Sequence, residues 1–110
     1  GMCEYICPAP FSPSDSIRIQ EIALRAYKTL GCRDFGRVDM IWREKRVYLL
    51  EVNTIPGLTD NSLLPRAARA GGIEFPQLVD KIVRQALRRQ AQHTPFEVSY
   101  KVDSVCQKIF

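Results

Sequence analysis

Four polar residues lie in two segments that otherwise have the composition of β-strands. Arg37 and Asp39 belong to FGRVDMIW (residues 35–42), and Glu51 and Asn53 end the segment VYLLEVN. Side chains alternate along a strand, so each pair shares one face of its strand. Two carboxylates, an amide oxygen and a guanidinium on one sheet face are uncommon unless they are paired or bind a metal. These hard oxygen ligands favour Mg²⁺ or Mn²⁺ over zinc.

The reversal between the two segments decides whether these side chains meet. The polar letters REKR separate the strands and predict an antiparallel hairpin. A three-residue loop at 44–46 places Asp39 opposite Glu51 and Arg37 opposite Asn53. A two-residue loop shifts the pairing by one residue and moves Glu51 to the other face. Because no Asn-Gly or Gly-Gly dipeptide favours the tighter turn, we predict the three-residue loop.

A simpler interpretation of the same pattern needs no metal. Arg37 can form an ion pair with Asp39 or Glu51 on the solvent side of a two-layer sheet, where polar faces are common. In this register Val47 and Leu49 share the face of Glu51. The opposite face is then apolar, with Val38, Met40, Trp42, Tyr48, Leu50 and Val52.

Three helices are predicted around this hairpin. The first is capped by Ser14 or Asp15, ends at about Leu30 and is followed by Gly31 as a left-handed cap. Its buried stripe is Ile19, Ile22, Ala23, Ala26 and Leu30.

The other two helices follow the turn-rich segment TIPGLTDNS. The shorter is capped by Asn61 or Ser62, contains Pro65 in its first turn and closes at Gly71-Gly72. The longer runs from Pro76 to about Gln90, with its arginines toward solvent. Its inner face comprises Leu78, Val79, Ile82, Val83, Ala86 and Gln90. In the tail, alternation at Phe96, Val98, Tyr100 and Val102 predicts an edge strand or a strand exchanged with another chain.

Composition narrows the function classes. The chain has 110 residues, 45% hydrophobic and 25% charged, which is typical of one soluble domain. It contains no apolar run long enough to span a membrane and no signal peptide, so we expect no membrane partner. The net charge of +4 comes from scattered basic residues with few aromatics between them, so we expect no nucleic-acid partner. The four cysteines match no common zinc spacing and are interpreted as reduced thiols.

We therefore predict an α+β fold, a small antiparallel hairpin sheet packed with about three helices. Residues 1–13 form an irregular lead-in, with Gly1 interpreted as a residue left by tag cleavage. Residues 14–90 form the folded unit, and residues 91–110 form the tail.

Several stretches are similar to a known family. GRVDMIW, YLLEVNTIPGLTDNSLLPRAARAGG, FPQLVDKIVRQAL and the leading YICPAPFS resemble the carboxy-terminal part of D-alanine–D-alanine ligases of the ATP-grasp superfamily. The resemblance covers roughly Tyr5 to Arg89, and the spacing of R-x-D and LLE-x-N-T-x-PG-x-T is highly specific. It implies a partial ATP-grasp subdomain.

The resemblance implies a role for each candidate residue in the sheet. Asp39, Glu51 and Asn53 would hold two Mg²⁺ ions that bridge the β- and γ-phosphates of ATP. Arg37 matches the arginine that stabilises the charged transition states.

It also implies roles in the loop that follows. Gly57 matches the glycine whose backbone N–H helps hold the tetrahedral oxyanion. Ser62 and Leu63 match the pair that binds the carboxylate of the second D-alanine, at a helix start where free N–H groups favour an anion. From the residues alone, Ser62 is equally an N-cap and Gly57 part of a Pro-Gly turn.

Family members carry an amino-terminal substrate domain and a central ATP-grasp subdomain that this sequence does not match. We therefore expect the chain alone to bind Mg·ATP weakly and not to ligate D-alanine, although the family makes a peptidoglycan precursor in the bacterial cytoplasm. The alternative is a non-catalytic ATP-grasp-derived binding module that acts through dimerisation or through a chain supplying the missing subdomains.

Overall fold

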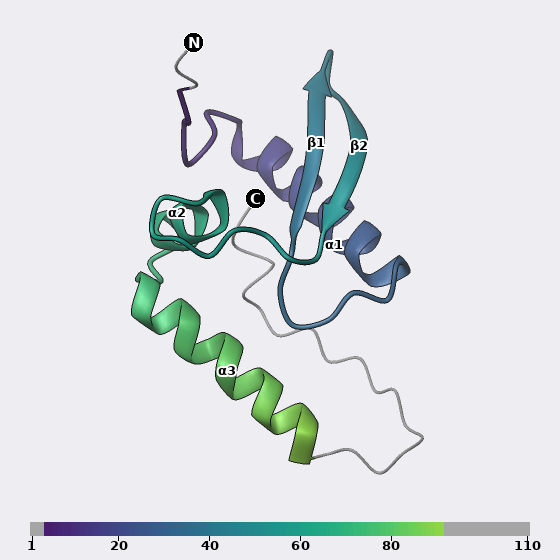
Figure 1. Cartoon of the computed structure of the whole chain (residues 1–110). Helices are drawn as coiled ribbons and strands as arrows, with labels where there is room; N and C mark the ends of the chain where they lie inside the picture. Colours follow the sequence, from purple (N-terminus) through teal and green to yellow (C-terminus); the bar gives the residue numbers. More distant parts are fainter. Residues whose placement is uncertain (1–3, 92–110) are drawn as a thin grey trace.

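The computed structural model describes residues 4–91, which form three helices and one β-hairpin (Figure 1). The order is α1 (Pro13–Thr29), β1 (Arg37–Arg43), β2 (Arg46–Asn53), α2 (Leu63–Ala70) and α3 (Phe75–Ala91). The predicted α+β fold with a small antiparallel sheet is confirmed. The tail strand predicted at residues 96–102 lies outside the described range. None of the described helices is long and apolar enough to cross a membrane.

Helix α1 begins earlier than predicted. Its N-cap is Ser12, and Pro13 occupies the first helical position, which suits a residue without an N–H group. The Ser12 hydroxyl donates to the Asp15 carboxylate (2.8 Å), and the Asp15 backbone N–H donates back to the Ser12 hydroxyl (3.2 Å). This pair satisfies one of the free N–H groups of the first turn. At the other end Gly31 adopts the predicted left-handed conformation (φ 68°).

The hairpin turn differs from the prediction. Arg43 pairs with Arg46, so the loop is the two-residue Glu44-Lys45, with φ values of 52° and 59°. Both central residues of this tight turn need positive φ, which is costly for side chains other than glycine. The Arg18 guanidinium donates to the Lys45 carbonyl (3.1 Å) and thereby fixes the turn to α1. The three-residue loop was therefore the wrong prediction.

A β-bulge restores the predicted pairing at the far end of the hairpin. Asp39 pairs with Glu51 but Met40 pairs with Leu49, which leaves Leu50 as an extra residue in β2. The bulge also corrects the predicted faces. Val47 and Leu49 share the face of their partners Trp42 and Met40. Tyr48, opposite Ile41, turns instead to the face of Asp39.

The face of the hairpin that carries Val38 packs on α1. Ala23, Tyr27 and Val38 form the centre of this contact, with Cys32, Met40 and Val52 around them. The predicted helix stripe is correct at Ile19 and Ala23 but misses Tyr27, which is buried, and Leu30 is 65% exposed. The stripe instead follows every fourth residue, Ile19, Ala23 and Tyr27, which is one face of a helix.

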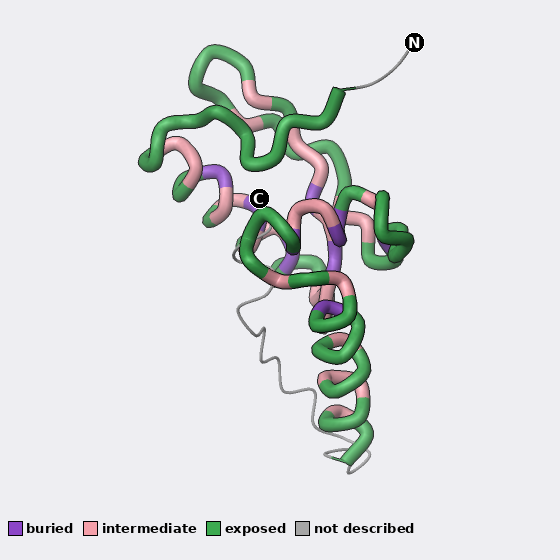
Figure 2. The backbone as a smooth tube through the Cα atoms, turned by 90° about the vertical axis from the view of Figure 1, so that its left-hand side faces the viewer, coloured by how far each residue is buried: buried purple, intermediate pink, exposed green. Residues whose placement is uncertain are grey.

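A second apolar cluster joins the two later helices. Leu64 and Ala68 of α2 pack on Leu78 of α3, and Phe35 joins them from the loop before β1. Beyond Leu78, α3 extends away from the rest and buries little, as Figure 2 shows. Its predicted inner face is therefore wrong at Val79 and Val83, which are 38% and 51% exposed, and at Gln90, which is also exposed.

Gly36 lets the loop before β1 pass close to the buried Tyr27 ring. A Cβ atom at this position would lie 2.7 Å from Tyr27 Cε2 and 3.2 Å from the Asn53 carbonyl oxygen. Both neighbours are held by packing or by the sheet, so neither can move without cost. The glycine thus allows the loop to pack closely on Tyr27 directly before β1.

We predict that Gly36→Ala lowers the free energy of unfolding by about 1–3 kcal/mol, because overpacking forces the ring or the strand to shift. Urea unfolding measures this change. In a Tyr27→Leu background the same substitution should cost less, since the ring is gone. Equal costs in both backgrounds would contradict the account. Gly72→Ala is the comparison: nothing lies within 4 Å of its Cβ position, so only its φ of 84° contributes strain.

Candidate active site

The strand pairing brings four predicted residues to one end of the hairpin. Arg37 lies opposite Asn53, and Asp39 lies opposite Glu51. Directly opposed residues point to the same side of a sheet, so two carboxylates, one amide and one guanidinium share a face. This face is the one turned away from α1. The predicted register at the site is confirmed, although it arises from a tight turn and a bulge together.

Arg37 and Asp39 form a two-pronged ion pair. Arg37 Nε donates to Asp39 Oδ1 (2.7 Å), and Arg37 Nη2 donates to Asp39 Oδ2 (2.8 Å). The hydrogen bond from Arg37 lowers the pKa of Asp39, against the opposing effect of burial. The same bond raises the pKa of Arg37, which stays charged. The ion pair predicted as the simpler interpretation is thus present. It uses one lone pair on each oxygen of the Asp39 carboxylate.

Asn53 serves as the start of the following turn. Its side-chain Oδ1 accepts a hydrogen bond from the Ile55 backbone N–H (3.0 Å). This side-chain turn bends the chain away from the sheet directly after β2. The amide oxygen therefore has a fixed direction and retains one free lone pair.

The oxygen ligands on this face can be compared with those that a divalent cation prefers. Among residues 4–91, no three His, Cys, Asp or Glu side chains are grouped to hold a metal. Asp39 and Glu51 supply two carboxylates, and Asn53 adds an amide oxygen. Each carboxylate accepts up to about four hydrogen bonds, so Asp39 keeps free lone pairs beside Arg37. Such a sparse oxygen set suits Mg²⁺ or Mn²⁺, which retain several waters, and does not suit zinc.

The loop from Thr54 to Ser62 forms a second group. A Cβ atom on Gly57 would lie 2.7 Å from Ser62 Oγ, so any larger residue there would require the Ser62 hydroxyl to move. Ser62 is the N-cap of α2, as predicted, but its side chain makes no capping hydrogen bond. The third helical residue is Pro65, which lacks the N–H group that a capping serine commonly binds. The Ser62 hydroxyl instead contacts Thr59 (2.7 Å between oxygens).

A cavity of about 500 Å³ lies between β1 and the first turn of α2. Arg37 and Asp39 line it from β1, and Leu63 lines it from the first turn of α2. Gly57 and Ser62 are not among its lining residues, nor are Glu51 and Asn53. The structure thus places three of the seven predicted residues around one cavity, and the other four are outside its lining, in β2 and in the loop.

Two further residues of this cavity were not predicted. Tyr5 lines it from the lead-in, and Arg66 lines it from α2, with the Arg66 guanidinium carbon 4.9 Å from the centre of the Tyr5 ring. This contact holds the lead-in against α2. Residues far apart in sequence give no periodic signal of such a contact, although Arg66 follows Leu63 by three positions and therefore shares its side of the helix.

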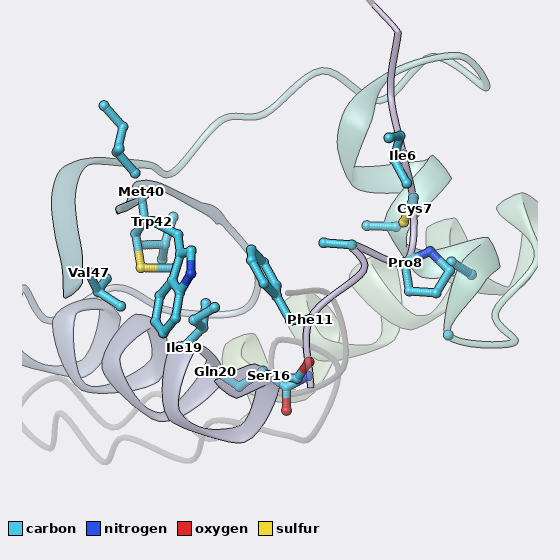
Figure 3. Close-up of a pocket in the computed structure, with 16 residues that line it drawn as sticks. Ile6, Cys7, Pro8, Phe11, Ser16, Ile19, Gln20, Met40, Trp42 and Val47 are labelled. Atoms are coloured by element: carbon cyan, nitrogen blue, oxygen red, sulfur yellow. The ribbon is translucent and has the colours of Figure 1, made fainter. Parts of the chain in front are cut away.

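A second, apolar cavity of about 380 Å³ adjoins the first and shares some of its lining, namely Ile6, Cys7, Val38, Met40 and Ala67. Figure 3 shows Phe11, Ile19, Met40 and Trp42 around it, and the rings of Phe11 and Trp42 are 5.6 Å apart. It is lined by apolar side chains, with Ser16 and Gln20 as polar exceptions. None of the four polar residues of the sheet lines it. It therefore lies where the lead-in packs between α1, the apolar face of the hairpin and the end of α2.

Comparisons with known proteins give consistent results. Residues 1–84 match the family described as D-ala D-ala ligase C-terminus. The D-alanine–D-alanine ligase of Thermotoga maritima is 50% identical over 90 residues, which are 82% of this chain and 30% of the relative. That of Marinobacter nauticus is 50% identical over 84 residues, which are 76% of this chain and 26% of the relative.

A solved structure has the same fold. The crystal structure of D-alanine–D-alanine ligase from Bacillus anthracis complexed with ATP superposes with a TM-score of 0.73 at 36% identity. The match covers 77% of this chain and 30% of that one. The chain therefore spans less than a third of the length of these relatives.

We predict that Asp39→Asn lowers the free energy of unfolding by about 1 kcal/mol at neutral pH, because it removes one charge of a half-buried pair. A carboxylate whose pKa is lowered on folding contributes stability above the ordinary aspartate pKa of about 3.9 and loses it as the pH falls through the folded value. The gap between wild type and variant should therefore be constant at neutral pH and close below about pH 4.

Urea unfolding followed by circular dichroism across this pH range checks the prediction. Asp80→Asn is the matched control, since Asp80 pairs with Arg84 on the exposed surface of α3 and should change little. A gap that widens toward low pH would contradict the assigned ion pair.

Proposed function

The chain belongs to the D-alanine–D-alanine ligase family through the family's C-terminal domain, and on this premise we propose that it forms the metal- and acceptor-binding part of an ATP-dependent ligase site. The proposed reaction joins the carboxylate of one D-alanine to the amine of a second. Its setting is the synthesis of a peptidoglycan precursor in the bacterial cytoplasm.

One observation carries this proposal. Arg37 and Asp39, at the phosphoryl end of the proposed site, line the same cavity as Leu63, at the acceptor end. A ligase must bring a phosphorylated carboxylate and an acceptor amine within reach of each other. A cavity lined by residues proposed for both ends of the site would allow that proximity.

The sheet residues would act on charge. Asp39, Glu51 and Asn53 would hold Mg²⁺, which neutralises phosphate charge during transfer to the carboxylate of the first D-alanine. Arg37 would stabilise the transferring phosphoryl group with fixed N–H donors. Its two bonds to Asp39 keep that fork oriented before any substrate arrives.

The loop residues would act on the acceptor. Ser62 and Leu63 would bind the carboxylate of the second D-alanine through a hydroxyl and a backbone N–H, beside the N-terminus of α2. The amine of that D-alanine then attacks the acylphosphate carbon, and phosphate leaves. The Gly57 N–H would donate to the oxyanion that develops on this carbon.

This chain matches only part of each relative, and this affects the activity that it can have alone. Since the chain spans about 30% of the Thermotoga maritima ligase, we propose that this polypeptide alone supplies one wall of the ATP site. Each missing contact to a charged phosphate costs about 1.5–3 kcal/mol, so several such losses leave weak binding. The remaining subdomains, on the same polypeptide or on a partner chain, would supply the other walls.

A segment exchange tests the function. The 30% of the Bacillus anthracis ligase that superposes on this chain would be replaced by the corresponding residues of this chain. We expect the hybrid to form D-alanyl-D-alanine with matching phosphate release. Asp39→Asn and Glu51→Gln should each lower kcat by at least about 100-fold, because each carboxylate would help to hold the two Mg²⁺ ions.

The isolated chain is the reference in the same assay. We expect it to release no phosphate above background with Mg·ATP and D-alanine. A folded hybrid that lacks ligase activity would contradict the proposed function. Turnover by the isolated chain that depends on D-alanine and Asp39 would contradict its assignment as one part of the site.

A second candidate function is a non-catalytic module that associates through its sheet. Tyr48 and Leu50 are 48% and 60% exposed on a sheet that has two strands within residues 4–91. Such an apolar, open-edged surface can pair with a second copy.

We predict that, if association is the function, the chain is a dimer at micromolar concentration and Leu50→Lys makes it monomeric. Sedimentation equilibrium measures this state, with exposed Leu87→Lys on α3 as the matched control. A monomer at millimolar concentration would contradict the second candidate and leave the ligase proposal intact.

A further inference from the structure

Thr59 and Ser62 close a small turn through three hydrogen bonds. The Ser62 backbone N–H donates to the Thr59 carbonyl (2.9 Å). In return the Thr59 backbone N–H donates to Ser62 Oγ (3.2 Å), and the two side-chain oxygens are 2.7 Å apart. Thr59 therefore contacts the Ser62 hydroxyl with both its backbone and its side chain.

The number of hydrogen bonds that the Ser62 hydroxyl can donate and accept limits how it can bind a carboxylate. A serine hydroxyl has one proton to donate and two lone pairs that accept. The Thr59 N–H fills one lone pair. In the oxygen–oxygen contact either atom can be the donor, but a carboxylate only accepts, so Ser62 binds one only by donating its proton. When it does, the Thr59 hydroxyl must be the donor to Ser62.

The Ser62 hydroxyl lies close to Gly57 and is hydrogen-bonded to Thr59. A Cβ atom on Gly57 would meet Ser62 Oγ at 2.7 Å, so the glycine leaves the room that this hydroxyl occupies. On the helix side the Ser62 side chain makes no capping bond, and Pro65 at the third helical position offers no N–H. The contacts that orient the hydroxyl in this structure are therefore those to Thr59.

We propose that Thr59 is a positioning residue, whose hydroxyl donates to Ser62 Oγ and so directs the Ser62 proton toward the acceptor carboxylate. This inference rests on the proposed acceptor role of Ser62 and adds the residue that orients it. Filling both lone pairs also polarises the Ser62 O–H bond and strengthens its own donation.

The test uses the whole chain labelled with ¹⁵N and ¹³C and titrated with D-alanine. Chemical shifts of the Ser62 and Leu63 amides report binding, and the Hα–Hβ couplings of Ser62 report its side-chain rotamer without any ligand. We expect millimolar affinity, as a charge-assisted pair of hydrogen bonds gives. D-alaninamide, which lacks the carboxylate, should not shift these amides.

The variants separate orientation from folding. Thr59→Val keeps the backbone and the branched shape but removes the hydroxyl; we expect about three- to tenfold weaker D-alanine binding and averaged Ser62 couplings. Thr59→Ser should restore both readouts. Thr29→Val, at the exposed end of α1, is the matched control and should match wild type in both.

The outcomes distinguish the inference from the function on which it rests. Fixed Ser62 couplings and unchanged affinity in Thr59→Val would overturn the role of Thr59 while leaving the acceptor site in place. Absence of any D-alanine shift at Ser62 and Leu63 in the wild type would overturn the acceptor role itself.

Discussion

The site depends on two carboxylates that face each other across neighbouring strands. Asp39 and Glu51 are directly paired, and like charges in this position repel. Arg37 neutralises the charge of Asp39 by donating to both of its oxygens. A divalent cation would neutralise the charge of Glu51, and it could bind because the arginine leaves lone pairs of both carboxylates free. The positive charge that balances the two carboxylates thus comes partly from Arg37, which is always present, and partly from a cation that must bind.

This arrangement requires a specific strand register, and the bulge at Leu50 provides it. The two-residue turn alone would pair Asp39 with Leu50 and turn Glu51 toward α1. One extra residue in β2 shifts the pairing back, and every residue on the turn side of Leu50 changes face with it. Tyr48 is exposed for the same reason. Bulges are over-represented beside active sites because they re-aim side chains in this way.

Much of the fold and of the site follows from local rules, and the failures have physical causes. The presence of the helices and of the polar face was predictable because the Ser62 cap, Gly31 and strand alternation leave signals within a few positions, although the cap of α1 is Ser12 and not Ser14 or Asp15. The two-residue turn was not predictable, because Glu44 and Lys45 adopt positive φ values that their side chains disfavour. The bulge was not predictable either, because an apolar residue such as Leu50 gives no sequence signal for one. Tyr27 and the Tyr5–Arg66 contact depend on packing between distant segments, which has no period in the sequence. Thr59 was overlooked because its partner Ser62 has a plausible role as a cap.

The most direct test of the account is paramagnetic broadening by Mn²⁺ in the ¹⁵N-labelled chain. Amide signals near residues 37–39 and 51–53 should broaden first, Mg²⁺ should reverse the effect, and Asp39→Asn or Glu51→Gln should abolish it. This readout needs no turnover and no second chain. Broadening centred on the other acidic side chains, such as Asp60 or Asp80, or broadening unchanged in both variants, would contradict the assignment of this face as the metal-binding part of a ligase site.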